Sequence, residues 1–307
     1  MHSTTVTAGI DVGGTKIAAG LVAADGTIVL RRERRTATAG RLRDPGLAGT
    51  TAAIADLLAE AAARGLDVAG LGVGLPEYVA ADGLVTSREV LAWDDQPLDT
   101  LDTALKAAGL EDVPRAVGSD VRCGALGEAA HGAGRDLGDF LYVSLGTGLS
   151  SAFVVDRTVW PGARGEAIAL GEFEVPASVA PDFAGNLEQF ASGRGIGDRY
   201  TALGRTPTPG AREVTALAAD GDPDAAAVLD TAGRALGTVL AAVVRLLDPR
   251  AVVLGGGLGT TDGPVSAALT RTYTALTAAR PGPPPLRRAE LGPDAGLIGA
   301  ALLPGAR

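Results

Sequence analysis

Residues 10–16 of this chain have the sequence Ile-Asp-Val-Gly-Gly-Thr-Lys, and no other stretch limits the possible folds as strongly. They end a short apolar run at 6–10 whose residues predict a strand. The two glycines lack Cβ atoms, so the turn after this strand can take strained backbone angles and bring its N–H groups close to an anion. By itself, a Gly-Gly-Thr turn between strands is also compatible with a plain hairpin.

The side chains around this turn favour a nucleotide-phosphate loop. A carboxylate before the turn can face a hydrated magnesium ion, while a hydroxyl and an ammonium group after the glycines supply a donor and a positive charge. The pattern differs from the G-x-x-x-x-G-K-[ST] loop of the P-loop enzymes. The residues expected to bind ATP and magnesium here are Asp11, Gly13, Gly14, Thr15 and Lys16.

The same chemistry recurs twice later in the chain. Residues 141–148 form an apolar run that leads into Gly-Thr-Gly, and a further apolar run follows at 151–156. Residues 251–259 combine a buried-type strand with a glycine cluster, against which a flat ring can lie. This layout is typical of the actin-like sugar kinases and ATPases. The corresponding ATP-binding residues are Gly146, Thr147, Gly148, Gly256 and Gly257.

Composition disfavours several classes of protein. The 307 residues exceed what one compact core usually holds, and 46% of them are hydrophobic, so two domains around a cleft are expected. A net charge of −9 disfavours a nucleic-acid partner, because phosphate backbones require a basic surface. Cys123 is the only cysteine, which rules out an intrachain disulfide. No signal-peptide pattern or long apolar run precedes the first strand, so we expect a cytoplasmic protein without a membrane partner.

Several motifs occur in the order that is found in one known family. They lie at residues 11–16, 72–76, 119–120, 145–148, 185–193, 254–257 and 296–301. On these motifs the chain resembles the ROK family (repressors, open reading frames, kinases) almost from end to end.

The resemblance implies a fold and its domains. Family members have an α/β, two-domain actin-like ATPase (ribonuclease H-like) fold, with mixed sheets flanked by helices and a cleft between the domains. The N-terminal domain would comprise residues 1–118 plus about 295–307, and the C-terminal domain residues 119–294. The resemblance also implies a homodimer, formed mainly through the second domain.

The resemblance further implies an ATP-dependent sugar kinase, in which the protein positions groups in line and offsets the charge of the transferred phosphate. Asp120 stands where the family has the carboxylate that takes the proton from the sugar hydroxyl. An aspartate at the start of the helix expected at 120–131 is also a normal helix cap, and both roles are compatible. Ser119 replaces the usual asparagine before it and is expected to contact the sugar.

A structural zinc is a feature of many family members, in which one histidine and three cysteines hold it just before a substrate glutamate. Residues 173–185 contain neither Cys nor His, so this chain is expected to lack the zinc. Asn186 stands at the position of the last zinc cysteine, and other packing must therefore fix the loop.

The expected sugar pocket departs from the family as well. By our alignment, Glu172 replaces a histidine and Ala169 a sugar-binding glutamate, although pairing through 165–166 is an alternative register. A carboxylate in place of an imidazole suits an ammonium group on the ligand. We therefore hypothesise that the enzyme phosphorylates the 6-hydroxyl of an amino hexose such as 3-amino-3-deoxyglucose (kanosamine). A surface role for Glu172 is the alternative. The other expected substrate-binding residues are Glu77, Ser87, Ser119, Asp120 and Glu188.

Other functions stay open from the sequence. With a plain hexose as acceptor, the enzyme would be a glucokinase or fructokinase. A non-catalytic sugar or nucleotide sensor of the same family would keep the loops, but the retention of Asp11, Thr15 and Asp120 speaks against it. A repressor of the family would carry a helix-turn-helix before the first phosphate loop, which begins here at residue 10. A polyphosphate-using kinase would need a basic groove, which this acidic chain does not suggest.

Overall fold

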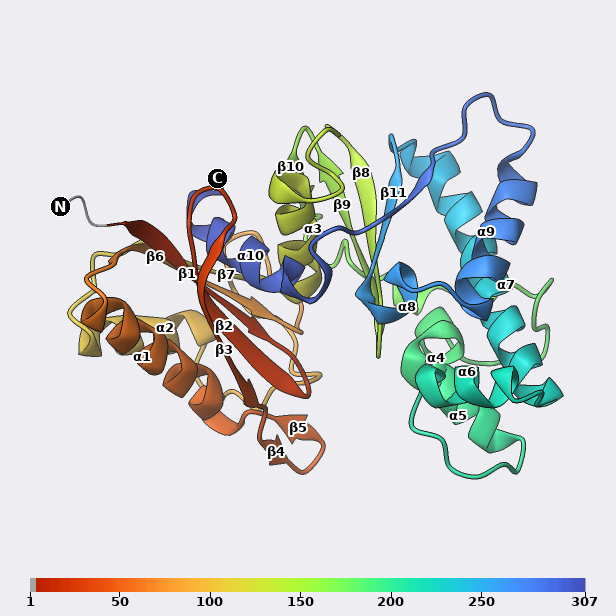
Figure 1. Cartoon of the computed structure of the whole chain (residues 1–307), viewed down its shortest axis with the longest axis horizontal. Coiled ribbons are helices and arrows are strands. Elements are labelled where there is room, and N and C mark those ends of the chain that lie inside the picture. The colour runs from red at the N-terminus through yellow and green to blue at the C-terminus, as the bar shows by residue number, and fades with distance from the viewer. Residues whose placement is uncertain (1–3, 307) are drawn as a thin grey trace. The chain divides into compact units, whose positions relative to one another are not determined.

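The computed structural model describes residues 4–306 and divides the chain into two compact units (Figure 1). The first unit contains the chain up to Asp136, the segment Ala152–Ile168 and the chain from Pro293 on. The second unit contains Leu137–Ser151 and Ala169–Gly292. The expected boundary at residue 118 differs from this division, because the structure keeps helix α3 (Asp120–His131) in the first unit.

Helix α3 groups with the first unit because it packs closely on α10 (Ala295–Leu302). A Cβ atom on Gly127 of α3 would lie 2.5 Å from the carbonyl oxygen of Ala295. A Cβ atom on Gly299 of α10 would lie 1.7 Å from the carbonyl oxygen of Cys123. Only glycine permits this approach of one backbone to another. The last helix thus lies in the same unit as α3.

The first unit is built on a five-stranded mixed sheet with the order β3-β2-β1-β6-β7. Strand β1 pairs antiparallel with β2 and parallel with β6, and β6 pairs parallel with β7. The strands are β1 (Thr5–Val12), β2 (Lys16–Val22), β3 (Ile28–Arg35), β6 (Asp67–Leu75) and β7 (Arg115–Ser119), and β4 (Thr38–Ala39) and β5 (Leu42–Arg43) form a short hairpin. Because β1, β6 and β7 are parallel neighbours, the residues that follow their carboxyl ends meet at one edge of the sheet.

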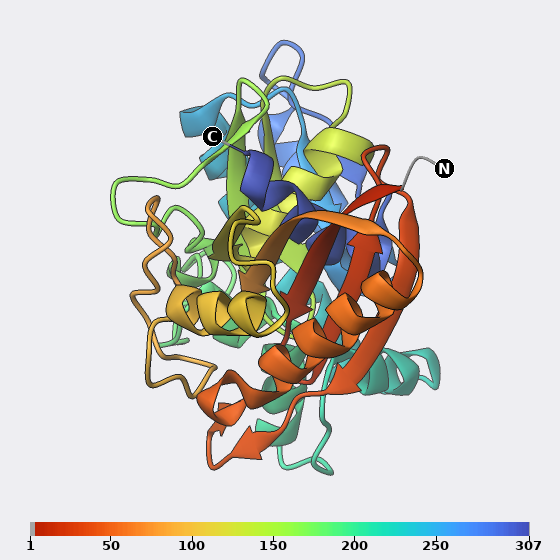
Figure 2. The same cartoon turned by 90° about the vertical axis from the view of Figure 1, so that its left-hand side faces the viewer.

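Helices cover both faces of this sheet (Figure 2), with α1 (Ala48–Ala63) and α2 (Pro97–Ala107) on one face and α10 on the other. Glycines in two central strands make room for α10. A Cβ atom on Gly9 would lie 2.3 Å from the carbonyl oxygen of Leu297, and one on Gly72 would lie 1.8 Å from that of Ala300. The close packing of α10 thus requires glycine in both strands.

The second sheet has the order β10-β9-β8-β11-β12, and its strand β9 runs from the second unit into the first. In the second unit, β11 lies between β8 and β12 and is parallel to both. In the first unit, β10 pairs antiparallel with the later part of β9. The strands are β8 (Phe140–Leu145), β9 (Leu149–Val155), β10 (Thr158–Trp160), β11 (Val252–Gly255) and β12 (Leu286–Arg288).

Most helices of the second unit follow β9. They are α4 (Leu187–Ala191), α5 (Gly193–Ala202), α6 (Ala211–Ala219), α7 (Pro223–Leu247), α8 (Gly256–Thr260) and α9 (Pro264–Thr277). Short 3-10 helices occur at Pro45–Leu47, Leu170–Glu172, Gly292–Asp294 and Leu303–Gly305. Within residues 4–306, α7 alone is long and apolar enough to cross a membrane, but 67% of its most apolar window is buried. Helix α7 is therefore a core helix.

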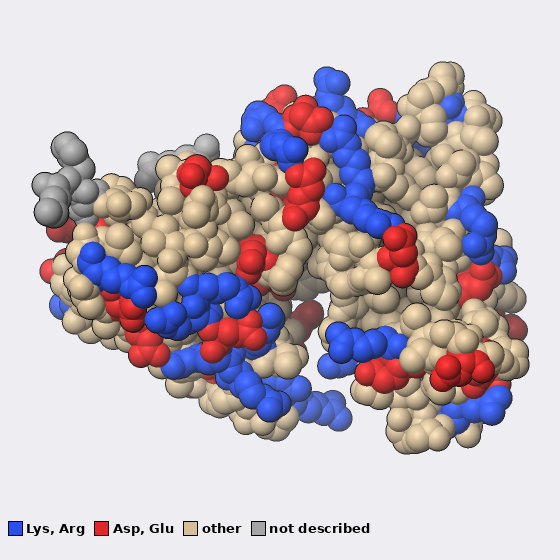
Figure 3. Space-filling model, viewed as in Figure 1, with Lys and Arg blue, Asp and Glu red and all other residues tan. Residues whose placement is uncertain are grey.

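Charged side chains of both signs cover the edge strand β3 and the neighbouring helix α1 (Figure 3). Arg34 pairs with Asp56 at 2.9 Å and Arg32 with Glu60 at 3.5 Å. The basic run at 31–35 is thus a solvated sheet edge. The strands expected at 6–10 and within 251–259 and the helix expected at 120–131 are confirmed within a few residues.

Candidate active site

The first glycine loop connects β1 to β2 and turns its carbonyl groups toward the protein. Thr36 Oγ1 donates to Gly13 O at 2.7 Å, Arg43 Nε donates to Gly14 O at 3.1 Å, and Thr36 N donates to Thr15 O at 3.0 Å. Gly13 N closes the turn by donating to Lys16 O at 2.9 Å. The N–H groups of Gly14 and Thr15 have no acceptor within residues 4–306. Two unpaired amides in one turn are a ready binding site for an anion.

Lys16 is expected to bind phosphate, but the structure gives its ammonium group a different partner. Lys16 lies at the start of β2, and its Nζ donates to Glu33 Oε2 on β3 at 3.0 Å. Both side chains are exposed. Lys16 therefore forms a cross-strand ion pair, and we assign no phosphate contact to it.

Asp11 is the carboxylate that β1 carries to the edge of the sheet. A Cβ atom on Gly296, in the first turn of α10, would lie 2.6 Å from Asp11 Oδ2, so this side chain packs against the start of that helix. Burial raises the pKa of Asp11 to about 6, the charge of Lys16 opposes this rise, and that of Asp294 adds to it. No hydrogen bond to its carboxylate occurs in the described part of the chain. Such a carboxylate fits a cation, because an oxygen ligand without a protein donor is what hydrated magnesium needs.

Asp120 follows β7 and is the first residue of α3, so the helix fixes the position of its carboxylate. Val121 N donates to Asp120 Oδ1 at 2.6 Å. Burial raises the pKa of Asp120 to about 7, and the charges of Asp11 and, more weakly, Glu77 add to this effect. The charges of Asp11 and Glu77 thus act on Asp120, in agreement with the positions of the three residues at or just after the carboxyl ends of parallel strands.

Ser119 and Glu77, both expected to bind substrate, are buried in the structure. Ser119 is 1% exposed, and its Oγ has no hydrogen-bond partner in the described residues. Glu77 is 4% exposed, and its two oxygens accept hydrogen bonds from the backbone N–H groups of residues 89–91 and from Ser87 Oγ. Glu77 and Ser87 thus bind each other and the backbone, which is an organising role that the sequence analysis did not foresee.

The second glycine loop connects β8 to β9 and has its carbonyl groups occupied in the same way. Gly193 N donates to Gly146 O at 2.8 Å, Arg194 N donates to Thr147 O at 3.1 Å, and Gly146 N donates to Gly148 O at 3.0 Å. The N–H groups of Thr147 and Gly148 have no acceptor within residues 4–306. This loop therefore also offers two amides to an anion.

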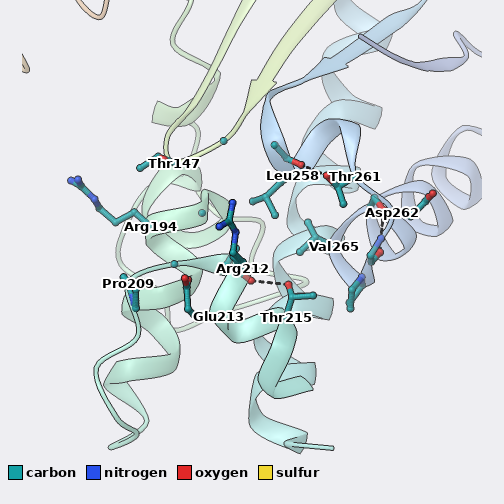
Figure 4. Close-up of a pocket in the computed structure, with 18 residues that line it drawn as sticks. Thr147, Arg194, Pro209, Arg212, Glu213, Thr215, Leu258, Thr261, Asp262 and Val265 are labelled. Carbon is teal, nitrogen blue, oxygen red and sulfur yellow. Dashed lines mark hydrogen bonds between the residues drawn. The ribbon is translucent and has the colours of Figure 1, made fainter. Parts of the chain in front are cut away.

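The second loop borders a cavity of about 610 Å³ in the second unit (Figure 4). Gly146, Thr147 and Gly257 line it, so the structure brings the second and third glycine clusters together. Gly256 lies beside the cavity rather than in its wall; it has a φ of 73°, and a Cβ atom on it would lie 2.4 Å from Leu145 O. The wall also contains polar residues that no sequence motif indicates, among them Arg194, Arg212, Glu213 and Asp262.

These polar wall residues come from α5, α6 and the turn before α9, whose sequences lack a recognised motif. Figure 4 shows the Arg212 side chain rising between Thr147 and Leu258, whereas Arg194 extends to one side. A serine is a common N-cap residue, so Ser192 could have indicated from the sequence that a helix begins here. In the structure, Ser192 Oγ caps α5 by accepting from Gly195 N at 3.1 Å. That cap places the first N–H groups of α5 against the second loop.

Glu188 and Glu172 lie near the second loop in the same unit. Leu149 N donates to Glu188 Oε2 at 3.1 Å, and a Cβ atom on Gly148 would lie 3.4 Å from this oxygen. Glu172 is exposed, and its Oε2 accepts from Asn186 Nδ2 at 3.3 Å. Glu172 is thus accessible to a ligand and is held only by a long hydrogen bond.

Asn186 shows what fixes the loop at the position of the family's zinc. Its Oδ1 accepts from Gln189 N at 2.9 Å, while Gln189 Oε1 accepts from Asn186 N at 3.1 Å, which is a capping box at the start of α4. Asn186 also forms an isolated antiparallel bridge with Glu174. In addition, Phe183 packs edge-on against Phe190, with ring centroids 4.8 Å apart. Hydrogen bonds and an aromatic pair therefore order this loop; the absence of zinc stays a prediction.

Comparisons with known proteins find similar sequences over almost the whole chain. The model of the ROK family matches residues 7–306. The N-acetylgalactosamine kinase AgaK of Shewanella sp. (strain ANA-3) is 31% identical over 306 residues, which cover 96% of this chain and 95% of that protein. The glucokinase of Streptomyces coelicolor is 29% identical over 322 residues, which cover 96% of this chain and 96% of that protein.

Solved structures show the same fold. The ROK hexokinase from Thermus thermophilus matches with a TM-score of 0.80 and 29% identity, over 97% of both chains. A ROK glucokinase from Streptomyces griseus, solved in complex with glucose and AMPPNP, matches with a TM-score of 0.77 and 28% identity, over 96% of this chain and 98% of that one. The expected α/β actin-like kinase fold is confirmed.

Proposed function

Because this chain belongs to the ROK family and is a carbohydrate kinase, we propose that it transfers the γ-phosphate of ATP to the 6-hydroxyl of a hexose or amino hexose. The observation that carries the proposal is shared by the two glycine loops. In each loop all three carbonyl groups are bonded to protein, while two amides keep their hydrogens free for phosphate oxygens. The cavity beside the second loop would hold the rest of the nucleotide.

Asp120 is the proposed general base. Its carboxylate accepts the proton of the sugar hydroxyl as the hydroxyl oxygen bonds to the γ-phosphorus and the bond to the bridging oxygen of ADP breaks. The bond from Val121 N and the start of α3 orient the carboxylate before substrate binds. Asp11 would hold the hydrated Mg²⁺ of the nucleotide, which supplies positive charge that offsets the phosphates.

The acceptor is proposed to carry an amino group, as in kanosamine. The support is the exposed carboxylate of Glu172, whose single long hydrogen bond leaves it able to accept from an ammonium group. Glu188, near the second loop, is the proposed partner for sugar hydroxyls. The bond between Glu172 and Asn186 also fits a purely structural role, in which case a plain hexose is the acceptor.

An ADP-release assay with a panel of sugars tests these statements. The panel contains glucose, fructose, glucosamine, 3-amino-3-deoxyglucose, N-acetylgalactosamine and N-acetylmannosamine, and phosphorus NMR identifies the phosphorylated hydroxyl. We expect kcat/KM to be highest for an amino hexose and to fall on Glu172→Gln for that sugar only. Glu174→Gln, a change of an exposed glutamate on the same loop, is the control. Faster turnover of glucose than of every amino sugar would exclude the amino-sugar proposal and leave the kinase proposal intact.

We further propose that the protein is a homodimer in the cytoplasm. The support is the family resemblance alone. Light scattering after size-exclusion chromatography measures the mass in solution, and a mass near 30.6 kDa at micromolar concentration would contradict the dimer.

A further inference from the structure

The first glycine loop is tied to a distant segment of the same unit through Arg43. Its Nε donates to Gly14 O at 3.1 Å, and its Nη1 donates to the carbonyl groups of Arg41 and Leu42 at 3.3 and 3.2 Å. Within residues 4–306 no carboxylate forms an ion pair with this guanidinium. Arg43 is therefore bound through main-chain carbonyls alone, one of them in the phosphate loop.

The backbone of Arg43 is itself held by the segment 87–92. Arg43 N donates to Val90 O at 2.8 Å, and Ala92 N donates to Arg43 O at 2.8 Å. These two bonds place Arg43 beside Leu91 as a parallel bridge. Val90 also faces the loop directly, because a Cβ atom on Gly14 would lie 3.7 Å from Val90 Cγ1.

Glu77 fixes the segment 87–92 in turn. Its carboxylate accepts from the N–H groups of Glu89, Val90 and Leu91 at 2.9, 2.8 and 2.7 Å, and from Ser87 Oγ at 2.5 Å. A carboxylate that is 4% exposed and receives four hydrogen bonds is a strong local constraint, because each bond is charge-assisted and shielded from water. Continuous contacts thus lead from Glu77 through residues 87–92 and Arg43 to Gly14.

We propose that Glu77, the segment 87–92 and Arg43 form a brace that sets the geometry of the first glycine loop for ATP. The inference rests on the proposed kinase function, in which that loop binds phosphate. The bond from Arg43 Nε holds the Gly14 carbonyl toward the protein, which keeps the unpaired amides of the loop turned toward the anion. Glu77 and Arg43 are positioning residues, since both act on the nucleotide through the loop.

Steady-state kinetics of Arg43 variants provide the first test. Arg43→Ala should raise the KM for ATP about tenfold, the loss expected for one hydrogen bond that orients a binding loop, with a smaller fall in kcat. Arg43→Lys keeps the charge but lacks the planar guanidinium, so it should not restore the KM. Arg41→Ala, which removes an exposed neighbouring arginine, is the matched control and should leave the KM for ATP unchanged.

Glu77 provides the decisive test, because the chain of contacts places it three steps from the loop. Glu77→Gln should raise the KM for ATP by at least about threefold. The double variant with Arg43→Ala should bind ATP no more weakly than Arg43→Ala alone, since both changes break the same brace. Ser87→Ala removes one of the four donors and should show a smaller effect in the same direction.

The outcomes separate the brace from the kinase proposal. A folded Glu77→Gln protein whose KM for ATP stays within about twofold of the wild type, or whose effect multiplies with that of Arg43→Ala, would overturn the brace. If Glu77→Gln does not fold, Ser87→Ala answers the same question. Calorimetric titration with AMPPNP measures donor affinity without turnover, so a wild-type protein that phosphorylates no sugar defeats the kinase proposal and still leaves the brace measurable.

Discussion

The two glycine loops offer the same groups to a ligand but are supported in different ways. In the loop after β1, side chains of Thr36 and Arg43 bind the carbonyl groups. In the loop after β8, the main-chain N–H groups of Gly193 and Arg194 at the start of α5 do so. Where side chains hold a loop, a substitution elsewhere in the unit can move those side chains and so change the loop. Where a helix end holds a loop, the contacts are main-chain hydrogen bonds and depend on the backbone alone.

The surroundings of the loops differ in charge as well. The first unit gathers three carboxylates at the edge of its sheet, and burial raises the pKa of two of them, Asp120 and Asp11. The second unit instead has a cavity with arginines among its polar lining residues. On the proposed roles, the first unit would supply the base Asp120, and the glycine loops of both units would bind phosphate.

The largest expected effect concerns the chemistry of the first unit. Asp120→Asn removes the base while keeping the size of the side chain, and we expect kcat to fall by about three orders of magnitude. Affinity for AMPPNP and sugar, measured by calorimetry, should change little. Asp112→Asn, at an exposed aspartate, is the control. Near-native turnover by Asp120→Asn would contradict the assignment of the base.

The next effect concerns binding by the second loop. A Cβ atom on Gly193 would lie 2.7 Å from Gly146 O, so Gly193→Ala must displace the loop from the start of α5. We expect the KM for ATP to rise about tenfold with kcat much less affected. Gly138→Ala, at a glycine with open space around its Cβ position, is the matched control. An unchanged KM would show that the second loop does not need this helix.

The pH dependence of catalysis tests the buried acid directly. Because the pKa of Asp120 is raised to about 7, its basic form is lost as the pH falls below that value. The kcat/KM for the sugar should therefore fall about tenfold per pH unit below pH 7 and level off above it. A profile that is flat down to pH 5 would show that another group accepts the proton.

The titration of Asp120 also affects stability, but in the opposite direction: low pH favours the folded state, whereas activity requires high pH. The folded protein keeps a proton on Asp120 that the unfolded chain releases near the ordinary aspartate pKa of 3.8. The contribution of this group to the free energy of unfolding therefore decreases as the pH rises from about 4 to about 7. Urea titrations at several pH values measure the free energy of unfolding. It should decrease with pH across this range in the wild type, and Asp120→Asn should lack this decrease.

The smallest expected effect concerns the loop before α4. Asn186→Ala removes the capping box and should lower the free energy of unfolding by about 1 kcal/mol, measured in urea. Asp182→Ala, at an exposed residue of the same loop, is the control. A loss several times larger would show that Asn186 holds more than the helix start.

Much of the architecture could be predicted from the sequence. Short-range rules determine where β1 ends in a glycine turn and where α3 begins. The loop residues Gly13, Gly14, Gly146 and Thr147 were found for the same reason, since a glycine turn after an apolar strand is a local pattern. Local patterns do not give every contact: Lys16 belongs to the first motif, and its ion pair with Glu33 across the sheet depends on the strand pairing.

The sequence by itself determined the strand–turn–strand units, the order of the motifs and the aspartate at the start of α3, because each depends on neighbouring residues and on backbone conformation. Only the tertiary structure decided that α3 lies in the first unit, that the carboxylate of Glu77 accepts four hydrogen bonds and that Arg43 binds the loop of Gly14. These outcomes depend on contacts between residues far apart in the chain, where a side chain binds whichever partner the packing brings within reach, and no local pattern specifies that partner.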